Sequence, residues 1–255
     1  MSALYHVAKY IIHNNPWYQI PGRFMLAMGY QCYKRLFRGI ISKNLFNGKK
    51  ILLFPNSPIA SAFVYTACPD KQEILALRAR ANENTIFLDI GANIGSYGIL
   101  LLDKVQAVYA FEAHPRTAQL CKMNFLLNQV DTSHVLSCAL SDVTGVKYFS
   151  DLPAGSPVNA VRLESTGAIS VPSMTLDQFM QEKQFPKACN FILKVDVEGF
   201  ELEVLQGASD FLRDHPNTPI LFEHFEGEEN KAMNFLKQRG YTFKRISPNN
   251  VLAER

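Results

Sequence analysis

Residues 87–97, with the sequence FLDIGANIGSY, combine residue types that can bind a nucleoside. An apolar run that contains Asp89 passes directly into a turn at Gly91, and glycine permits both a tight bend and a close approach of the backbone to a ligand. A second apolar run, at 107–111, ends on Glu112, about twenty residues past the glycine, where a βαβ unit places its ribose-binding carboxylate. Two separate features therefore predict one nucleoside site.

The glycine spacing indicates which nucleoside is bound. A dinucleotide site needs G-x-G-x-x-G to hold a pyrophosphate, but Asn93 stands where the middle glycine would be. The acid at Asp89 also suits a cationic ligand better than a phosphate. S-adenosylmethionine, which carries an ammonium and a sulfonium and no phosphate, fits both observations. An ordinary strand-to-helix turn could show the same glycines, but Glu112 at the expected distance argues against it.

A third apolar run, at 191–197, is interrupted by charges that could do chemistry. The two-residue period of a strand puts Lys194 and Asp196 on one face, with Glu198 just past the end. Charges on a buried strand are retained when they are paired or functional, and ligands of open α/β sheets lie at the carboxyl ends of the strands. We expect Lys194 to form a structural ion pair with Asp196, and Asp196 and Glu198 to face the substrate.

Two residues at the end of the next predicted strand, Glu223 and His224, could face the same crevice. His224 could equally be a packing residue or open a helix. The two acids Asp196 and Glu198 are too few to predict a metal site, so we expect none.

Three motifs give the chain a family resemblance. They are FLDIGANIG, which ends at Gly95, the tripeptide Thr175-Leu176-Asp177, and LKVDVEGFELEVLQGA at 193–208. With these motifs the chain resembles the FkbM-type methyltransferases, a class I family that depends on S-adenosylmethionine. The resemblance covers about residues 60–245, and the first 50 or so residues match nothing.

The resemblance implies a Rossmann-like class I methyltransferase fold, with a mostly parallel central sheet flanked by helices. A helical extension at 1–50 would precede a methyltransferase domain at 51–255. The cofactor would be S-adenosylmethionine, and the acceptor a hydroxyl of a sugar, glycan or natural product. Asp142 occupies the position that often contacts adenine in this class, although it could be a plain turn residue. The expected cofactor-binding residues are Asp89, Gly91, Ala92, Asn93, Gly95, Glu112 and Asp142, and the expected catalytic residues are Asp196, Glu198, Glu223 and His224.

The apolar runs predict the elements that position these residues. After N-terminal helices and a strand near 62–65, we expect core strands at 86–90, 107–111, 135–140, 191–197 and 219–223. The intervening helices are expected at 72–81, 96–104, 115–128, 176–184, 199–213 and 228–239, and this alternation implies a parallel sheet. An antiparallel pair at 146–150 and 168–173 would flank a long loop at 151–167, either a substrate lid or a surface excursion, and 241–246 with 251–253 would close the fold as a hairpin.

Charge is distributed unevenly along the chain. Residues 1–68 contain eight Lys or Arg and no acid, whereas the remainder has 18 basic and 23 acidic residues. A helix over 26–40 would place five apolar residues on one narrow face, namely Leu26, Tyr30, Tyr33, Phe37 and Ile40. Such a basic, aromatic segment could lie on an anionic membrane, or its aromatic stripe could pack against the domain as a cap.

Composition limits the remaining function classes. Five cysteines without C-x-x-C spacing argue against a disulfide framework or a zinc site, and no apolar run reaches the roughly 18 residues that span a bilayer. We therefore expect a cytoplasmic enzyme, peripheral at the membrane if the basic segment binds lipid, with no nucleic acid partner. Two alternatives stay open: a non-catalytic S-adenosylmethionine-binding protein that docks on membranes or anionic polymers, and, less favoured, a nicotinamide-dependent oxidoreductase.

Overall fold

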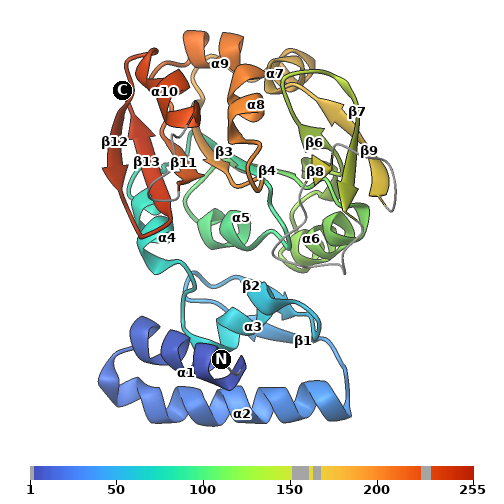
Figure 1. Ribbon diagram of the computed structural model, residues 1–255, viewed down its shortest axis with the longest axis vertical. Helices are drawn as coiled ribbons and strands as arrows, with labels where there is room; N and C mark the ends of the chain where they lie inside the picture. The colour runs from blue at the N-terminus through green and yellow to red at the C-terminus, as the bar shows by residue number, and fades with distance from the viewer. Residues whose placement is uncertain (1–2, 151–160, 163–167, 225–230) are drawn as a thin grey trace.

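The computed structural model describes residues 3–150, 161–162, 168–224 and 231–255. Figure 1 shows them as a large body with a smaller N-terminal layer at one end. The loop expected at 151–167 lies outside the described residues except for Val161–Arg162. No described helix has both the length and the apolar character needed to cross a membrane.

A central sheet forms the middle of the body. Among the described residues it has seven strands in the order β12-β13-β11-β10-β3-β4-β5. The first five in chain order are parallel, and β13 is antiparallel to both of its neighbours. Their bounds are β3 (Thr85–Ile90), β4 (Ala107–Phe111), β5 (Val135–Leu136), β10 (Asn190–Val195), β11 (Ile220–Glu223), β12 (Thr242–Arg245) and β13 (Asn250–Glu254). This order confirms the expected class I methyltransferase fold.

Helices cover both faces of this sheet, because successive strand residues point to opposite sides. Phe87 belongs to the apolar cluster under α4 (Lys71–Arg78), α5 (Ser96–Leu101) and α6 (Pro115–Leu127). Its neighbour Leu88 belongs to the cluster under α7 (Leu176–Lys183), α8 (Glu201–Gln206), α9 (Ser209–Asp214) and α10 (Lys231–Lys237). A one-turn helix, η2 (Thr132–His134), leads into β5.

The Thr175-Leu176-Asp177 tripeptide joins two of these helices. Thr175 is the N-cap of α7, and its hydroxyl accepts a hydrogen bond of 3.0 Å from Gln178 N. The Asp177 carboxylate accepts hydrogen bonds from the backbone N–H groups of Asp210 (3.0 Å) and Phe211 (2.8 Å) in α9. The motif therefore starts one helix and fastens it to another.

Three expected elements differ most from the structure. The strand at 135–140 divides, and its second part, β6 (Ala139–Leu140), joins β9 (Ala168–Met174), β7 (Gly145–Ser150) and β8 (Val161–Arg162) in a separate sheet of the order β6-β9-β7-β8. The helix at 199–213 divides at Gly207, where a Cβ atom would lie only 2.0 Å from the carbonyl oxygen of Ser141. The prediction of a strand near 62–65 is wrong. This segment belongs to helix α3 (Pro58–Tyr65), because Ser57 caps the helix and Pro58 opens it.

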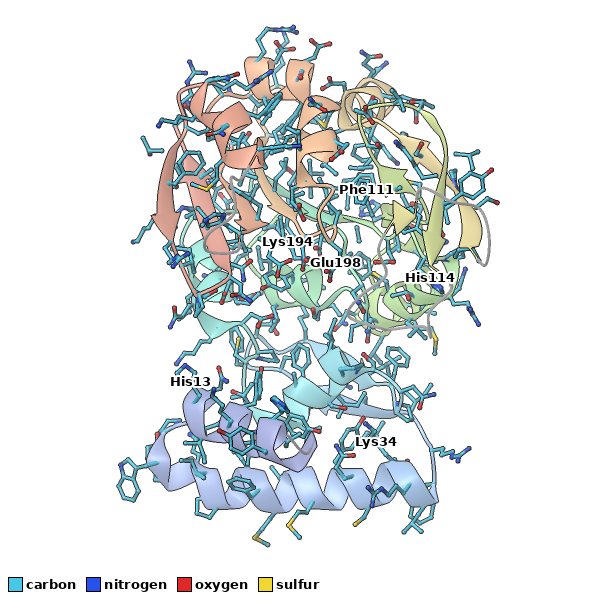
Figure 2. The ribbon with its side chains drawn as sticks, viewed as in Figure 1. His13, Lys34, Phe111, His114, Lys194 and Glu198 are labelled. Carbon is cyan, nitrogen blue, oxygen red and sulfur yellow. The ribbon has the colours of Figure 1, made fainter. Side chains whose placement is uncertain are left out.

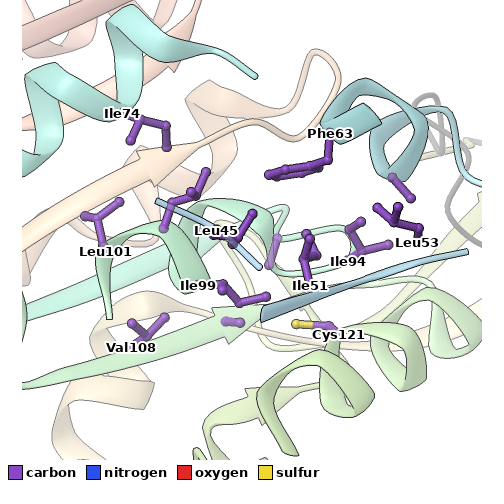
Figure 3. Packing of buried hydrophobic residues seen from close by; sticks show 14 of the residues in the cluster. Leu45, Ile51, Leu53, Phe63, Ile74, Ile94, Ile99, Leu101, Val108 and Cys121 are labelled. Carbon is purple, nitrogen blue, oxygen red and sulfur yellow. The ribbon is translucent and has the colours of Figure 1, made fainter. Parts of the chain in front are cut away.

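The N-terminal layer consists of α1 (Ala3–Asn14), the short η1 (Trp17–Gln19), α2 (Ile20–Leu36), a hairpin of β1 (Ile41–Asn44) and β2 (Lys50–Leu53), and α3. Side chains at the end of α6 dock the hairpin: Asn124 accepts from Leu52 N at 2.8 Å, and Asn128, the C-cap residue, accepts from Lys50 N at 2.8 Å. Figure 3 shows Leu45, Ile51 and Phe63 in one apolar cluster with Ile94, Ile99 and Cys121 of the body. The layer therefore shares the body's core, and the domain boundary expected after residue 50 falls inside the hairpin.

Candidate active site

A pocket opens at the carboxyl ends of β3, β4 and β10, where open α/β sheets bind ligands. The turn after β3, the end of β4 and the segment after β10 supply most of its polar lining, while α3 and the second sheet supply apolar walls. Its lining includes Gly91, Ala92, Asn93, Glu112, Lys194, Asp196 and Glu198, with Ile59, Asp70, Tyr97, Leu140 and Phe149 at the sides.

The turn after β3 has an unusual backbone. Gly91, Asn93 and Gly95 have φ angles of +77°, +51° and +80°, in the left-handed region that favours glycine. At Gly91 a Cβ atom would lie 1.8 Å from the carbonyl oxygen of Asp196. The close approach that requires this glycine is therefore made by the neighbouring segment of the protein itself.

Asp89 lies beneath the pocket and is not part of its lining. Its side chain is fully buried; Oδ2 accepts a hydrogen bond from Gly98 N (3.2 Å), and Oδ1 lies 3.6 Å from Lys194 Nζ. Burial raises the pKa of Asp89, while Lys194 and the Gly98 N–H lower it. In this position Asp89 holds α5 and Lys194, and a ligand in the pocket would not touch it.

Glu112 lines the pocket at the end of β4, as the spacing predicts. Its two oxygens accept backbone hydrogen bonds of 2.9 Å from Asn93 N and His114 N, which fix the plane of the carboxylate. Burial raises the pKa of Glu112 to about 7, although these two N–H groups lower it. Each carboxylate oxygen can still accept a second hydrogen bond, so the pair suits the two hydroxyls of a ribose.

Lys194 links the strands on either side of the pocket floor. Its Nζ donates to the carbonyl oxygen of Gly91 (3.0 Å) and lies 3.1 Å from Asp196 Oδ2, so the predicted ion pair is confirmed. Burial lowers the pKa of Lys194, but the carboxylates of Asp196 and Asp89 raise it by more, and the ammonium stays charged. The contact with Asp89 follows from the register of β10 and β3, in which these two residues are directly opposite.

The turn after β10 aims Glu198 at the pocket. Glu198 and Gly199 have φ angles of +55° and +93°, and Glu201 Oε1 holds the turn by accepting from Val197 N (3.4 Å) and Gly199 N (3.1 Å). Strained backbone of this kind concentrates at functional sites. Burial, followed by the negative charges of Asp196 and Glu201, raises the pKa of Glu198. Figure 2 shows Glu198 near Lys194, on the side of the body that faces the N-terminal layer.

Glu223 and His224, at the end of β11, are not among the residues that line the pocket. Burial and the charges of Asp196, Glu198 and Glu201 raise the pKa of Glu223 to about 7, which places its carboxyl in the field of the same acidic group. His224 is held by its backbone N–H, which donates to Asn249 O at 2.7 Å.

The structure does not bring Asp142 to the pocket. Its carboxylate is largely exposed, accepts a hydrogen bond from Ser141 Oγ (2.8 Å) and lies 3.5 Å from Lys147 Nζ. The hydrogen bond from Ser141 and the charge of Lys147 lower the pKa of Asp142. The same segment reaches the pocket a few residues earlier, through Cys138 and Leu140.

The predicted site residues did not include two polar side chains of the lining, those of Asp70 and Tyr97. Asp70 lies at the pocket edge before α4, with a φ of +49°, and its carboxyl is hydrogen-bonded to the Tyr97 side chain. Asp70 is the first acid of the chain, and this is the one signal in the sequence that could have marked it. Within the described ranges, no group of three or more His, Cys, Asp and Glu side chains is arranged to hold a metal ion.

The lining fits S-adenosylmethionine. Glu112 offers a carboxylate to a ribose, and Asp196 and Glu198 supply negative charge toward a cation. The space beside Gly91 and Gly95 is filled by Asp196 O and by Cys121 and Phe125, so these two glycines do not form a cradle for a pyrophosphate.

The family described as the methyltransferase FkbM domain matches residues 89–243, more than half of the chain. The hexuronic acid methyltransferase AglP of Haloferax volcanii is 30% identical over 145 residues, which cover 56% of this chain and 58% of AglP. Methyltransferase 1 of Beauveria bassiana is 26% identical over 150 residues, with 50% and 60% of the two chains covered. The chain thus spans about three fifths of the length of these curated relatives.

Among solved structures, the Pyrococcus abyssi tRNA (uracil-54, C5)-methyltransferase in complex with S-adenosyl-L-homocysteine superposes with a TM-score of 0.46 at 14% identity. The superposition covers 84% of this chain and 43% of that one. The match over residues 89–243 includes the turn after β3, Glu112 and the whole segment from Lys194 to Glu201. The chain belongs to the FkbM methyltransferase family, whose methyl donor is S-adenosylmethionine.

Proposed function

We propose that the protein transfers a methyl group from S-adenosylmethionine to a hydroxyl of a sugar, glycan or natural-product acceptor. The observation that carries this proposal is Glu198, a carboxyl of raised pKa that a left-handed turn holds in the pocket lining together with Glu112. The similarity to a hexuronic acid methyltransferase supports a sugar as the acceptor.

The chain's residues divide the work of binding. Glu112 would hold the ribose, and the acidic lining would favour the cationic end of the cofactor. When bound, S-adenosylmethionine supplies a methyl group that is already activated by the positive charge on its sulfur. The protein's main contribution is then to align the acceptor, which can be worth up to roughly 7 to 11 kcal/mol.

A hydroxyl acceptor also needs a base to take its proton as the new bond forms. A base is most effective when its pKa lies near the working pH, and the pKa of Glu198 is raised toward that range. Asp196 is held by the Lys194 ammonium, which makes it the better group for orienting the acceptor. We therefore assign the role of general base to Glu198. Glu223 is the second candidate for this role.

The charge of the described lining favours a neutral acceptor group. Four carboxyl groups, those of Asp70, Glu112, Asp196 and Glu198, surround the single ammonium of Lys194. That ammonium is already engaged by Gly91 O, Asp196 and Asp89. A carboxylate acceptor would be repelled here, so a hexuronic acid would present a hydroxyl to the pocket and keep its carboxylate outside.

The test is incubation with methyl-labelled S-adenosylmethionine and matched oligosaccharides that differ in having a hexuronic acid or the corresponding neutral sugar. Mild alkali then separates the products, because a methyl ester is hydrolysed and a methyl ether survives. Alkali-stable label is expected. Label released by alkali would show a carboxylate acceptor and overturn the hydroxyl assignment.

Substitution separates catalysis from binding. Glu198→Gln should lower kcat at least about 100-fold with a smaller change in cofactor affinity, since it removes the base and only one of the several carboxyl groups of the lining. Glu83→Gln, at an exposed position outside the pocket, is the matched control. Normal turnover of both Glu198→Gln and Asp196→Asn would reject this assignment and move the base to Glu223 or His224.

A further inference from the structure

Helix α2 carries an apolar stripe that the rest of the described structure does not cover. Met25, Met28 and Leu36 are 75%, 67% and 75% exposed, and helical geometry places all three within an arc of about 80°. Trp17 and Tyr18, 82% and 65% exposed, precede the stripe in η1. We call these five residues, three in α2 and two in the preceding η1, the outer face of α2.

The opposite side of α2 is already used. Ala27 and Tyr30 are buried, Tyr33 packs against the same apolar cluster, and Lys34 Nζ donates to Ser61 Oγ of α3 at 3.1 Å. The stripe predicted from the sequence is therefore split. The helix ends at Leu36 and not at Ile40, and the two tyrosines turn inward as a cap while Phe37 is 70% exposed. The outer face is a different set of residues, left free by that packing.

Positive charge accompanies this face. Residues 1–69 contain eight Lys or Arg and no acid, and Lys9, Arg35 and Arg38 are exposed. Arg35 immediately precedes Leu36 of the outer face, and Arg38 follows it closely. A second copy of this layer would bring like charges together, whereas an anionic surface would complement them.

We propose that the outer face of α2 docks the protein on the surface of an anionic lipid bilayer. Met25, Met28 and Leu36 would enter the boundary between headgroups and acyl chains, and Trp17 and Tyr18 are residue types that prefer the headgroup level. Arg35 and Arg38 would meet the anionic headgroups. Figure 1 shows α2 at the far end of the N-terminal layer from the body, so docking leaves the active-site pocket uncovered.

The fluorescence of Trp17 can be used to detect this contact, because Trp17 is the single tryptophan of the chain. The full chain is mixed with phosphatidylcholine vesicles with and without phosphatidylserine, and both sedimentation and tryptophan emission are measured. We expect binding and a blue shift only with phosphatidylserine, both fading as salt is raised. Quenching by brominated lipid would place Trp17 at the bilayer.

Two variants test the two parts of the face. Met25→Ser/Met28→Ser/Leu36→Ser and Arg35→Glu/Arg38→Glu should each lower the apparent affinity for these vesicles at least roughly 10-fold. Leu75→Ser, at an exposed leucine of α4, and Lys187→Glu/Lys237→Glu, at two exposed lysines of the body, are the matched controls and should bind normally. Thermal unfolding of each variant checks that it folds.

Three outcomes would overturn the proposal. One is wild-type protein that stays in the supernatant at low salt with phosphatidylserine. A second is equal binding to neutral vesicles, which would mean unspecific adsorption. The third is a concentration-dependent dimer in sedimentation velocity that the Met25→Ser/Met28→Ser/Leu36→Ser variant abolishes, which would make the outer face a contact between copies of the chain.

Discussion

The carbonyl oxygen of Asp196 lies 1.8 Å from the place where a Cβ atom of residue 91 would stand, so Gly91 and Asp196 fit together only because one of them is a glycine. Two further contacts tighten the junction: Asp196 N donates to Ile90 O (3.0 Å), and Lys194 Nζ donates to Gly91 O (3.0 Å). The turn expected to bind the cofactor and the segment expected to meet the acceptor are thereby fixed to each other.

Gly91→Ala should destabilise the protein far more than Gly48→Ala. Both glycines have similar left-handed φ angles, +77° and +75°, but a Cβ at residue 48 meets no atom within 4 Å. The backbone penalty alone is about 1 to 2 kcal/mol, and overlap with the Asp196 backbone adds a further 1 to 3 kcal/mol or so. Urea unfolding of the two variants measures the difference, and equal losses would mean that the overlap relaxes at no cost.

Removing the Lys194 ammonium should cost about 3 to 5 kcal/mol of unfolding free energy, because Lys194→Met leaves the buried carboxylate of Asp89 without its cation. Asp89→Asn in the same chain should recover part of the loss. Arg213→Met removes two ion pairs of an arginine that is 65% exposed, and it should change stability far less than Lys194→Met. A loss no larger than that of Arg213→Met would contradict the structural role given to Lys194.

Glu112 should contribute to cofactor affinity through charge-assisted hydrogen bonds. Glu112→Ala should weaken the binding of S-adenosylmethionine or S-adenosylhomocysteine by about 1.5 to 3 kcal/mol in calorimetric titration. Glu83→Ala, an exposed acid, should leave the affinity unchanged. Wild-type protein that bound NAD and ignored S-adenosylhomocysteine would contradict the assignment of the pocket.

Glu112 should also make the ligand-free protein less stable as pH rises. Its pKa is raised from 4.5 to about 7 by burial, so the folded state binds more protons than the unfolded state between these values. Stability from this group is complete below about pH 4.5 and declines until about pH 7. The free energy of unfolding of the wild type and of Glu112→Gln is measured from about pH 4 to about pH 9. Between about pH 4.5 and pH 7 the wild type should lose stability relative to the variant. Parallel curves would mean that the pKa of this carboxyl is the same in the folded and unfolded states, and would contradict the raised pKa.

The features that the sequence predicts well depend on short spacing. Glu112 follows the glycine turn after one helix and one strand, and Lys194 and Asp196 are two residues apart at the end of β10. Both relationships are set by local geometry. The helix at Pro58–Tyr65 could also have been predicted, since Ser57 and Pro58 form a standard helix start. The apolar residues that follow them led to the wrong prediction of a strand.

The features that were missed depend on which strands become neighbours. Lys194 and Asp89 are separated by more than a hundred residues and meet only because β10 lies beside β3. Asp142 lies away from the pocket because the chain leaves the central sheet after Leu136. Asp70 reaches the pocket from the segment between α3 and α4, whose path cannot be predicted from hydrophobic periodicity. Single-residue patterns carry no information on such long-range choices.

The departure of β6 from the central sheet gives the pocket two walls that belong to different sheets. One wall depends on β3, β4 and β10, whose register fixes Gly91, Glu112 and Lys194. The other, with Leu140 and Phe149, belongs to the β6-β9-β7-β8 sheet, which has its own hydrogen-bond ladder. Leu140 packs in the apolar cluster that also contains residues of β3, β4 and β10, whereas Phe149 packs in a separate small cluster with Ala139 and Val171. Substitutions around Phe149 can therefore change the width of the pocket with little effect on the positions of Gly91, Glu112 and Lys194.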